Sequence, residues 1–236
     1  MLSSELARVG EENVKEYTLK LAVVADEPAA LYAEDIHAHL LHKERTHPIG
    51  PIAANSYITA PIRKIIIEWM IEAHLELGLR EETLYMAIDV FDRFLAARAV
   101  ARTQAQLVSM AALLIACKYE EECCPFIRDI VYFCDGTYSC AQLRDMESLV
   151  LNALHFEVCN VTIVPFLARY HSESVAQSKL RHYLAQTALL NGNTMLPSAL
   201  AAACVSLDKT LVALIANNPP GIRQKFAFLD ALLPKC

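Results

Sequence analysis

The chain has 236 residues, of which 55% are hydrophobic, and its formal net charge at pH 7 is −6. This length and composition predict a globular protein with a substantial core, while the acidic charge and the scattered lysines and arginines argue against a protein that binds nucleic acid or anionic membranes. The mean hydropathy is above zero, so we expect apolar surface to remain outside the core, where it usually marks a binding site for a partner.

The N-terminal part of the chain has two predicted segments. Residues 1–32 are an extension of mixed character, with a short helix predicted over 4–24. Residues 33–44 predict a second helix, with acidic residues in its first turn and Ile36 on its apolar face. That helix and the loop that follows it, up to residue 60, form the predicted N-terminal helix and linker.

Residue types that bind metals are frequent in this helix and beside it: His37, His39, His42 and His47 accompany Glu34 and Asp35. Residues 37 and 42 do not share one face of a helix, however, and the other spacings do not supply a complete ligand set. The sequence also has no C-x-x-C pair, so its eight cysteines do not indicate a zinc site. We therefore predict neither a metal nor a cofactor.

The cysteines bear on the compartment as well. The N-terminus carries no basic segment followed by an apolar run, so we expect no signal peptide. Without a signal peptide the chain is expected in a reducing compartment, where its eight cysteines would stay free thiols. The adjacent Cys123 and Cys124 favour neither zinc nor a disulfide, and are most simply loop residues.

Five helices with short connections are predicted next. Pro61 suits the first turn of a helix and Gly78 is a natural residue to follow its end. Ser139 and Gln142 have the spacing of a capping box, which predicts a helix start. The predicted helices are 61–77, 81–95, 103–122, 125–133 and 139–154.

The third of these helices is predicted to be central. Between Leu107 and Cys117 every residue except Ser109 is apolar, and a helix without a polar face must be covered on all sides. The run is shorter than the roughly 18 apolar residues that a membrane span needs, so the cover must be protein. Thr103 and Gln106 have capping-box spacing and predict the start of this helix.

The pattern starts again after Phe156. Helices are predicted over 162–170, 175–190, 196–216 and 220–232, and the third of them has nearly the same small, apolar composition as the central helix. No stretch alternates in the manner of a strand. The chain is therefore predicted to be all-α, with one five-helix bundle over 61–158 and a shorter, incomplete bundle of the same plan over 159–236.

The bundle contains, in this order, the segments IRKIIIEWMIE, ETLYMAIDVFDRFLA, QLVSMAALLIACKYEEECCP, DIVYFCDGTYS, MESLVLNALHFEV and VPFLARY. In order and spacing these segments resemble the cyclin box, the helical bundle of the cyclins. The earlier segment YAEDIHAHL resembles the helix that precedes the box in A- and B-type cyclins. The resemblance implies a regulatory subunit of the nucleus and cytoplasm that binds and activates a cyclin-dependent Ser/Thr kinase and performs no chemistry itself.

The resemblance also implies a kinase-binding site. Lys118 and Glu147 match a pair of charged residues that hold backbone groups of the kinase, for which a lysine offers three donors and a carboxylate several acceptor positions. The alternative is that both are ordinary solvated residues near helix ends. The matching apolar contact positions, whose alternative role is core packing, are Ile36, Ile115, Tyr119, Leu151 and Phe156.

A second implied site is a docking patch for substrates and inhibitors that carry an Arg-x-Leu segment. Its residues would be Ile62, Ile65, Ile66 and Trp69 on one helical stripe, with Glu72 for the arginine and Gln106 for the peptide backbone. The alternative is a buried stripe, since Ile67, Ile71 and Leu75 give the same helix a second apolar face. The chain departs from the family at Ile62, Lys64 and Ala105, which replace Met, Ala and Leu.

Arg63 and Asp92 match a family pair with an internal role, a bidentate ion pair that would join the first two helices of the box.

The remaining alternative for the whole chain is a cyclin-box protein of the transcription-initiation type. Such a protein binds DNA and requires a basic face, which this acidic chain does not indicate. An enzyme is not expected, because no Gly-rich phosphate loop, G-x-S-x-G or other catalytic motif is present.

Overall fold

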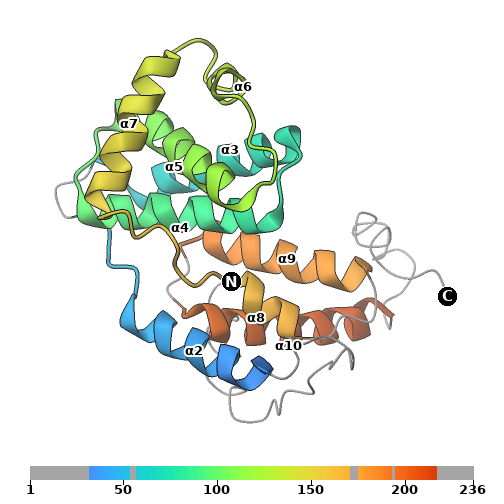
Figure 1. Ribbon diagram of the computed structural model, residues 1–236. Helices are drawn as coiled ribbons and strands as arrows, with labels where there is room; N and C mark the ends of the chain where they lie inside the picture. Colours follow the sequence, from blue (N-terminus) through green and yellow to red (C-terminus); the bar gives the residue numbers. More distant parts are fainter. Residues whose placement is uncertain (1–31, 54–56, 171–174, 193–194, 217–236) are drawn as a thin grey trace. The chain divides into compact units, whose positions relative to one another are not determined.

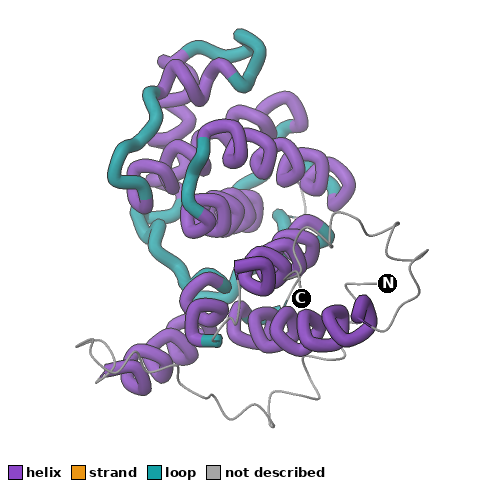
Figure 2. The backbone as a smooth tube through the Cα atoms, turned by 90° about the vertical axis from the view of Figure 1, so that its right-hand side faces the viewer, coloured by secondary structure: helices purple, strands orange, loops and turns teal. Residues whose placement is uncertain are grey.

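The structure is a computed structural model that describes residues 32–53, 57–170, 175–192 and 195–216 (Figure 1). In these ranges the regular structure is entirely helical, as the tube in Figure 2 also shows, so the predicted all-α class is confirmed there. The helices are α2 (Ala33–Thr46), α3 (Ala60–Leu77), α4 (Glu81–Ala97), the 3₁₀ turn η2 (Arg102–Gln104), α5 (Ala105–Glu120), α6 (Ile127–Tyr132), α7 (Cys140–Ala153), α8 (Val164–Arg169), α9 (Val175–Leu190) and α10 (Pro197–Ala216). The helices predicted over 4–24 and 220–232 lie outside the described residues.

The chain divides into two compact units. One is continuous in sequence, Lys43–Val164, and contains helices α3 to α7. The other combines Met1–His42 with Pro165–Cys236, so that most of α2 belongs with the C-terminal segment. None of the described helices is both long enough and apolar enough to cross a membrane.

Helix α5 is the core of the Lys43–Val164 unit. It contacts α3, α4, α6 and α7 (Figure 1), and every residue from Leu107 to Cys117 is buried. The buried polar residue in this run, Ser109, donates its hydroxyl hydrogen to the carbonyl of Gln106 at 2.8 Å, so its polar group is satisfied. The predicted central helix is thus confirmed.

The predicted start of α5 is wrong, however. Residues Arg102–Gln104 already form a 3₁₀ turn, in which the Gln104 amide donates to the Ala101 carbonyl at 2.9 Å, and α5 begins without a side-chain cap. A capping hydroxyl requires an extended backbone at its own residue, and Thr103 lies inside this turn. By contrast, Ser139 is extended, with φ −90° and ψ 160°, and its capping box with Gln142 is confirmed by bonds of 3.2 and 2.8 Å.

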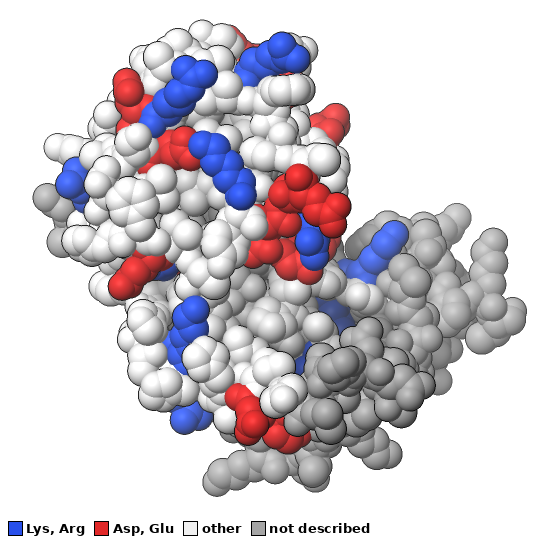
Figure 3. Space-filling model, viewed as in Figure 1, with Lys and Arg blue, Asp and Glu red and all other residues white. Residues whose placement is uncertain are grey.

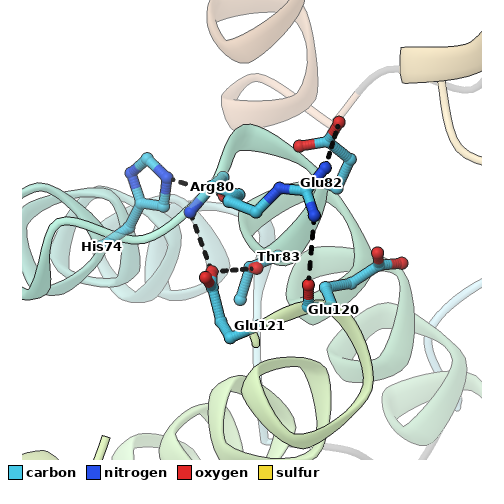
Figure 4. A network of polar contacts seen from close by, with 6 residues as sticks. All are labelled: His74, Arg80, Glu82, Thr83, Glu120 and Glu121. Atoms are coloured by element: carbon cyan, nitrogen blue, oxygen red, sulfur yellow. Dashed lines mark hydrogen bonds and ion pairs between the residues drawn. The ribbon is translucent and has the colours of Figure 1, made fainter. Parts of the chain in front are cut away.

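Helix α4 obtains its cap from a distant part of the chain (Figure 4). Its N-cap residue, Arg80, has no side-chain cap bond of its own. Instead, the Glu121 carboxylate, just past the end of α5, accepts the Arg80 backbone amide at 2.8 Å and the Thr83 hydroxyl at 2.5 Å. A carboxylate at a helix N-terminus is favoured by the helix dipole, so this contact stabilises the start of α4 and joins it to the end of α5.

Helix α3 ends at Gly78, whose φ of 63° lies in the left-handed region. No heavy atom lies within 4 Å of a Cβ added there, so the cost of a side chain is confined to the backbone. We expect Gly78→Ala to lower the free energy of unfolding by about 1 kcal/mol in urea denaturation. Gly50→Ala is the matched control, since its added Cβ meets only Ala96 at 3.6 Å without a left-handed backbone, and an equal loss in both variants would contradict the expectation.

A buried carboxylate on α4 holds the loops at both ends of the unit. Asp89 accepts a hydrogen bond from the Asn160 side chain at 3.0 Å, and the same amide group donates to the His47 carbonyl at 3.4 Å. Arg93, one turn later, lies 3.5 Å from the other carboxylate oxygen. Burial raises the pKa of Asp89 to about 6 in spite of the opposing charge of Arg93.

This pKa predicts a pH dependence of stability. Because the folded pKa of Asp89 lies above its ordinary value of 3.8, the folded state binds the proton more tightly, and the stabilisation by protonated Asp89 is complete below about pH 4 and lost as the pH rises through 6. The unfolding free energy of wild type minus that of Asp89→Asn should therefore fall by about 2 kcal/mol from pH 4 to 7. Urea denaturation of both proteins across this range measures it, and parallel curves would contradict it.

In the other unit, α9 and α10 pack together, and α2 lies against α8. Arg169 of α8 donates to the Ala33 carbonyl at 3.0 Å and to the Glu34 carboxylate at 2.8 Å, so one guanidinium joins α8 to the first turn of α2. The His37 ring meets the Phe166 ring edge-on, with centroids 5.9 Å apart. Among the described residues no group of three or more His, Cys, Asp or Glu side chains could hold a metal ion.

Candidate functional site

Lys118 and Glu147 come together on the surface of the Lys43–Val164 unit. Lys118 lies in the last turn of α5, where the helix leaves the core, and Glu147 lies on α7. The ammonium nitrogen and a carboxylate oxygen are 2.5 Å apart, with the Lys118 side chain 52% exposed and that of Glu147 12% exposed. The lysine retains further donors and the glutamate further acceptor positions, so the pair can bind backbone carbonyl and amide groups of another protein.

Large apolar side chains lie near this pair in the sequence. Tyr119 follows Lys118 and is 53% exposed, while Leu151, one turn after Glu147, is half-buried. Ile115 is only 4% exposed and packs in the core, the alternative considered for it from the sequence. Ile36 is 49% exposed and belongs to the other unit.

Phe156 is displayed by an unusual turn. It is 64% exposed, and both it and His155 have left-handed backbones, with φ of 60° and 52°. Its amide donates to the Leu151 carbonyl at 2.9 Å, which closes the end of α7 and directs the chain away from the helix. Residues other than glycine adopt such conformations at a cost in energy, and they cluster at functional sites.

The stripe on α3 is divided between core and surface. Ile67 and Met70 are fully buried, whereas Ile65 is 62% exposed and Ile62, Ile66 and Trp69 are half-buried. The predicted second apolar face is therefore present in part, since Ile67 supplies it while Leu75 is exposed. Glu72 is exposed near the end of this stripe, and Gln106 is half-buried in the first turn of α5, where its side chain caps no helix.

Arg63 and Asp92 form a bidentate ion pair between α3 and α4. Nε lies 2.6 Å from Oδ1, and Nη2 lies 2.6 Å from Oδ2. The two side chains are only 9% and 15% exposed, so the pair is largely shielded from water. Arg63 thus points to the interior of the unit, away from the exposed stripe on its own helix.

Charges are distributed unevenly near the end of α5. Acidic side chains gather where α4 begins and α5 ends (Figure 3), around the network of Figure 4. There the Arg80 guanidinium bonds the Glu120 carbonyl at 3.4 Å and pairs with Glu82 at 3.3 Å. Burial raises the pKa of Glu120, and the nearby charge of Glu82 adds to the rise.

The sequence reasoning missed an aromatic group on α6 and at its start. Phe126 and Tyr132 are 66% and 81% exposed, and the Arg128 guanidinium carbon lies 4.6 Å from the centre of the Phe126 ring. The helix has only six residues, so its periodicity could not assign these side chains to the surface. The sequence did carry a signal for this group, because Phe126 and Arg128 are two residues apart and Tyr132 follows Arg128 by one helical turn.

Comparisons with known proteins agree with this architecture. Residues 35–159 match the family model described as Cyclin, N-terminal domain. G2/mitotic-specific cyclin-B2 of Mesocricetus auratus is 36% identical over 187 residues, which cover 77% of this chain and 47% of that protein. Cyclin-A2 of Xenopus laevis is 36% identical over 220 residues, which cover 90% of this chain and 53% of that protein. The chain thus spans about half the length of the curated relatives it matches.

A solved structure supports the same fold. The X-ray structure of a viral cyclin from Herpesvirus saimiri is similar with a TM-score of 0.64 at 16% sequence identity, over 76% of this chain and 82% of that one. The family model covers more than half of the 236 residues, and the relatives in sequence are mitotic cyclins. The resemblance to A- and B-type cyclins is therefore confirmed, and the chain belongs to the cyclin family.

Proposed function

We propose that this chain is a regulatory subunit that binds a cyclin-dependent Ser/Thr kinase and activates it in cell-cycle control. The observation that carries the proposal is the Lys118–Glu147 pair, whose 2.5 Å contact joins α5 and α7 at the surface, with the exposed Tyr119 and Phe156 close to it in sequence. If Lys118 and Glu147 were ordinary solvated residues, neither the burial of the Glu147 carboxylate nor the left-handed backbone of Phe156 would be needed. Cyclins are regulatory subunits without catalytic activity, so no reaction is assigned to the chain.

Activation would follow from a shift of population. The Lys–Glu ion pair of a protein kinase forms only when the helix that carries the glutamate moves inward. A partner that binds the inward state more tightly shifts the equilibrium toward it by the difference between its two affinities. Lys118 and Glu147 would hold backbone groups of the kinase, while Ile36, Tyr119, Leu151 and Phe156 would cover apolar side chains.

We further propose that the α3 surface recruits substrates and inhibitors with an Arg-x-Leu segment. The exposed Ile65 and the half-buried Trp69 offer apolar area, and the exposed carboxylate of Glu72 suits an arginine. Ile62 and Ile66 would complete the apolar surface, and the Gln106 amide would bond the peptide backbone. This assignment also explains why α3 retains apolar residues outside its buried face.

The finer domain plan and the location are proposals as well. Residues 61–158 would form a five-helix cyclin box and residues 159–236 a shorter second box, preceded by the helix and linker of 33–60 and the extension of 1–32. Most of α2 groups with the C-terminal segment, which suggests that it stabilises the second box. We expect the protein in the nucleus and the cytoplasm, where such kinases act.

The test is capture and activation of purified kinases. Immobilised protein is mixed with a panel of cyclin-dependent kinases, and phosphorylation of a Ser/Thr peptide is measured with and without it. We expect at least one kinase to be retained and its rate to rise by an order of magnitude or more. Kinases that are neither bound nor activated would refute the proposal, and retention of duplex DNA at physiological salt would favour the transcription-initiation type instead.

The docking surface has its own expected result. A fluorescent Arg-x-Leu peptide should bind wild type with micromolar affinity, and Trp69→Ala should weaken this binding about tenfold because it removes the largest apolar contact. Fluorescence anisotropy measures both dissociation constants. Tyr57→Ala is the control, since Tyr57 is a large, exposed aromatic residue outside the stripe. Equal losses of peptide affinity in the two variants would contradict the assignment.

A further inference from the structure

We infer that His155 is a positioning residue, whose left-handed backbone forms a rigid turn after α7 that presents the Phe156 side chain to a bound kinase. The inference rests on the proposed function. It goes beyond that function because His155 is not among the implied kinase contacts, and because it states how one of those contacts is held in place before a partner arrives.

The turn after α7 has the hydrogen bonds of a Schellman motif, a common ending of helices. The Phe156 amide donates to the Leu151 carbonyl at 2.9 Å, and the His155 amide donates to the Asn152 carbonyl at 3.2 Å. The residue after the cap has a left-handed backbone in this motif, and the φ of His155 is 52°. The two proposed apolar contacts Leu151 and Phe156 are therefore the first and last residues of one structural motif.

Local hydrogen bonds fix this turn. Besides the two bonds of the motif, the Leu154 amide donates to Val150 at 3.0 Å, the Glu157 amide to Leu154 at 2.9 Å, and the Val158 amide to Phe156 at 3.0 Å. Every backbone amide from residue 154 to residue 158 thus has a partner in the turn or at the end of α7. The turn needs no partner to hold its shape, so less conformational entropy is lost when a kinase binds Phe156.

The turn costs stability that folding alone would not require. His155 and Phe156 both have left-handed backbones, which glycine adopts without a steric cost and other residues do not. His155 is exposed and Phe156 is 64% exposed, so burial of their side chains does not offset this cost. Backbone strain of this kind is typical of sites where a side chain must be held in one place for a partner.

Asp135 provides a matched comparison in the same unit. It is exposed, its φ is 48°, and it is followed by a second left-handed residue, Gly136. Asp135 and His155 lie beyond opposite ends of α7, a helix of 14 residues that is therefore about 21 Å long. A substitution at Asp135 thus strains the backbone far from Phe156, and it separates a general loss of stability from a loss of position.

The test replaces His155 by valine, whose branched side chain disfavours a left-handed backbone, and by glycine, which adopts it freely. In isothermal titration calorimetry with a kinase that wild type binds, His155→Val should weaken binding about tenfold, and His155→Gly should restore the affinity. Asp135→Val should lower the urea midpoint of unfolding as His155→Val does, yet bind the kinase as wild type does. If His155→Val does not fold, His155→Ala replaces it, with an expected loss of about threefold.

A double-mutant cycle shows whether His155 acts through Phe156. Phe156→Ala alone should weaken kinase binding about tenfold, because it removes an exposed aromatic contact. Adding His155→Val to Phe156→Ala should then cause little further loss, since the side chain that the turn presents is already absent. Losses that add in full would mean that His155 does not act through Phe156, and the inference would be wrong.

The remaining outcomes separate the inference from the proposed function. If His155→Val binds like wild type while Lys118→Ala with Glu147→Ala abolishes binding, the inference is wrong and the proposed function stands. If His155→Gly loses as much affinity as His155→Val, the imidazole and not the backbone is responsible, which also overturns the inference. An equal loss of affinity in Asp135→Val would assign the effect to stability alone and overturn it too. If wild type binds no kinase, the proposed function and the inference both fall.

Discussion

Replacing Arg63 by alanine is expected to lower the free energy of unfolding by about 3 kcal/mol. The reason is that Asp92, only 15% exposed, would lose both of its 2.6 Å bonds and remain as a shielded, unpaired carboxylate between α3 and α4. Urea denaturation followed by circular dichroism measures the change. Arg63→Lys should be intermediate, since a lysine keeps the charge but cannot form the bidentate pair.

The matched control for this prediction is Lys64→Ala. Lys64 is the next residue on α3 and is exposed, so its loss should change stability by no more than about 0.5 kcal/mol. Binding of an Arg-x-Leu peptide by Arg63→Ala should be unchanged at temperatures where the variant is folded, because Arg63 points away from the docking surface. A variant that unfolds at the same urea concentration as wild type would show that the pair does not join the helices.

The largest effect on function is expected from the double variant Lys118→Ala, Glu147→Ala. It removes both members of the surface pair and leaves no unpaired charge behind, which either single substitution would do. If each residue contributes as a strong interface contact does, the dissociation constant for the kinase should rise by at least a hundredfold, corresponding to about 3 kcal/mol. Calorimetric titration and kinase activation at a fixed cyclin concentration should show parallel losses.

A second double variant serves as the control for charge. Lys64→Ala with Glu68→Ala also removes one positive and one negative exposed side chain, but on α3. It should bind and activate the kinase as wild type does when the substrate peptide has no docking segment. Equal loss in the two double variants would mean that the effect is one of general electrostatics, and binding retained without Lys118 and Glu147 would remove the main support for the proposed kinase-binding site.

Local features of the structure were largely predictable from the sequence. Helix α9 has the predicted bounds, α3 ends at Gly78, and Ser139 and Gln142 cap α7, because each of these depends on residues within a few positions of one another. The capping box expected at Thr103 failed for a related reason. The backbone there had already turned through a bond to Ala101, which the side-chain spacing does not reveal.

Contacts between distant residues could not be obtained in this way. Glu121 caps α4 although 41 residues separate it from Arg80, and Asn160 reaches Asp89 across 71 residues. The pairs Lys118–Glu147 and Arg63–Asp92 were expected only through the cyclin resemblance, since nothing in their separation of 29 residues brings the side chains together. Phe126, Arg128 and Tyr132 had no such resemblance and were overlooked.

The sequence by itself determined that this protein is helical and that the run from Leu107 to Cys117 is buried, because a helix without a polar face must be covered whatever covers it. Only the tertiary structure decided which charged side chains meet at the ends of that helix and which apolar ones stay exposed. Periodicity reports which face of a helix is apolar, whereas the packing of several helices against one another selects the part of that face that is covered. Ile67 and Ile65 lie on one helix, and this packing buries the first and leaves the second at the surface.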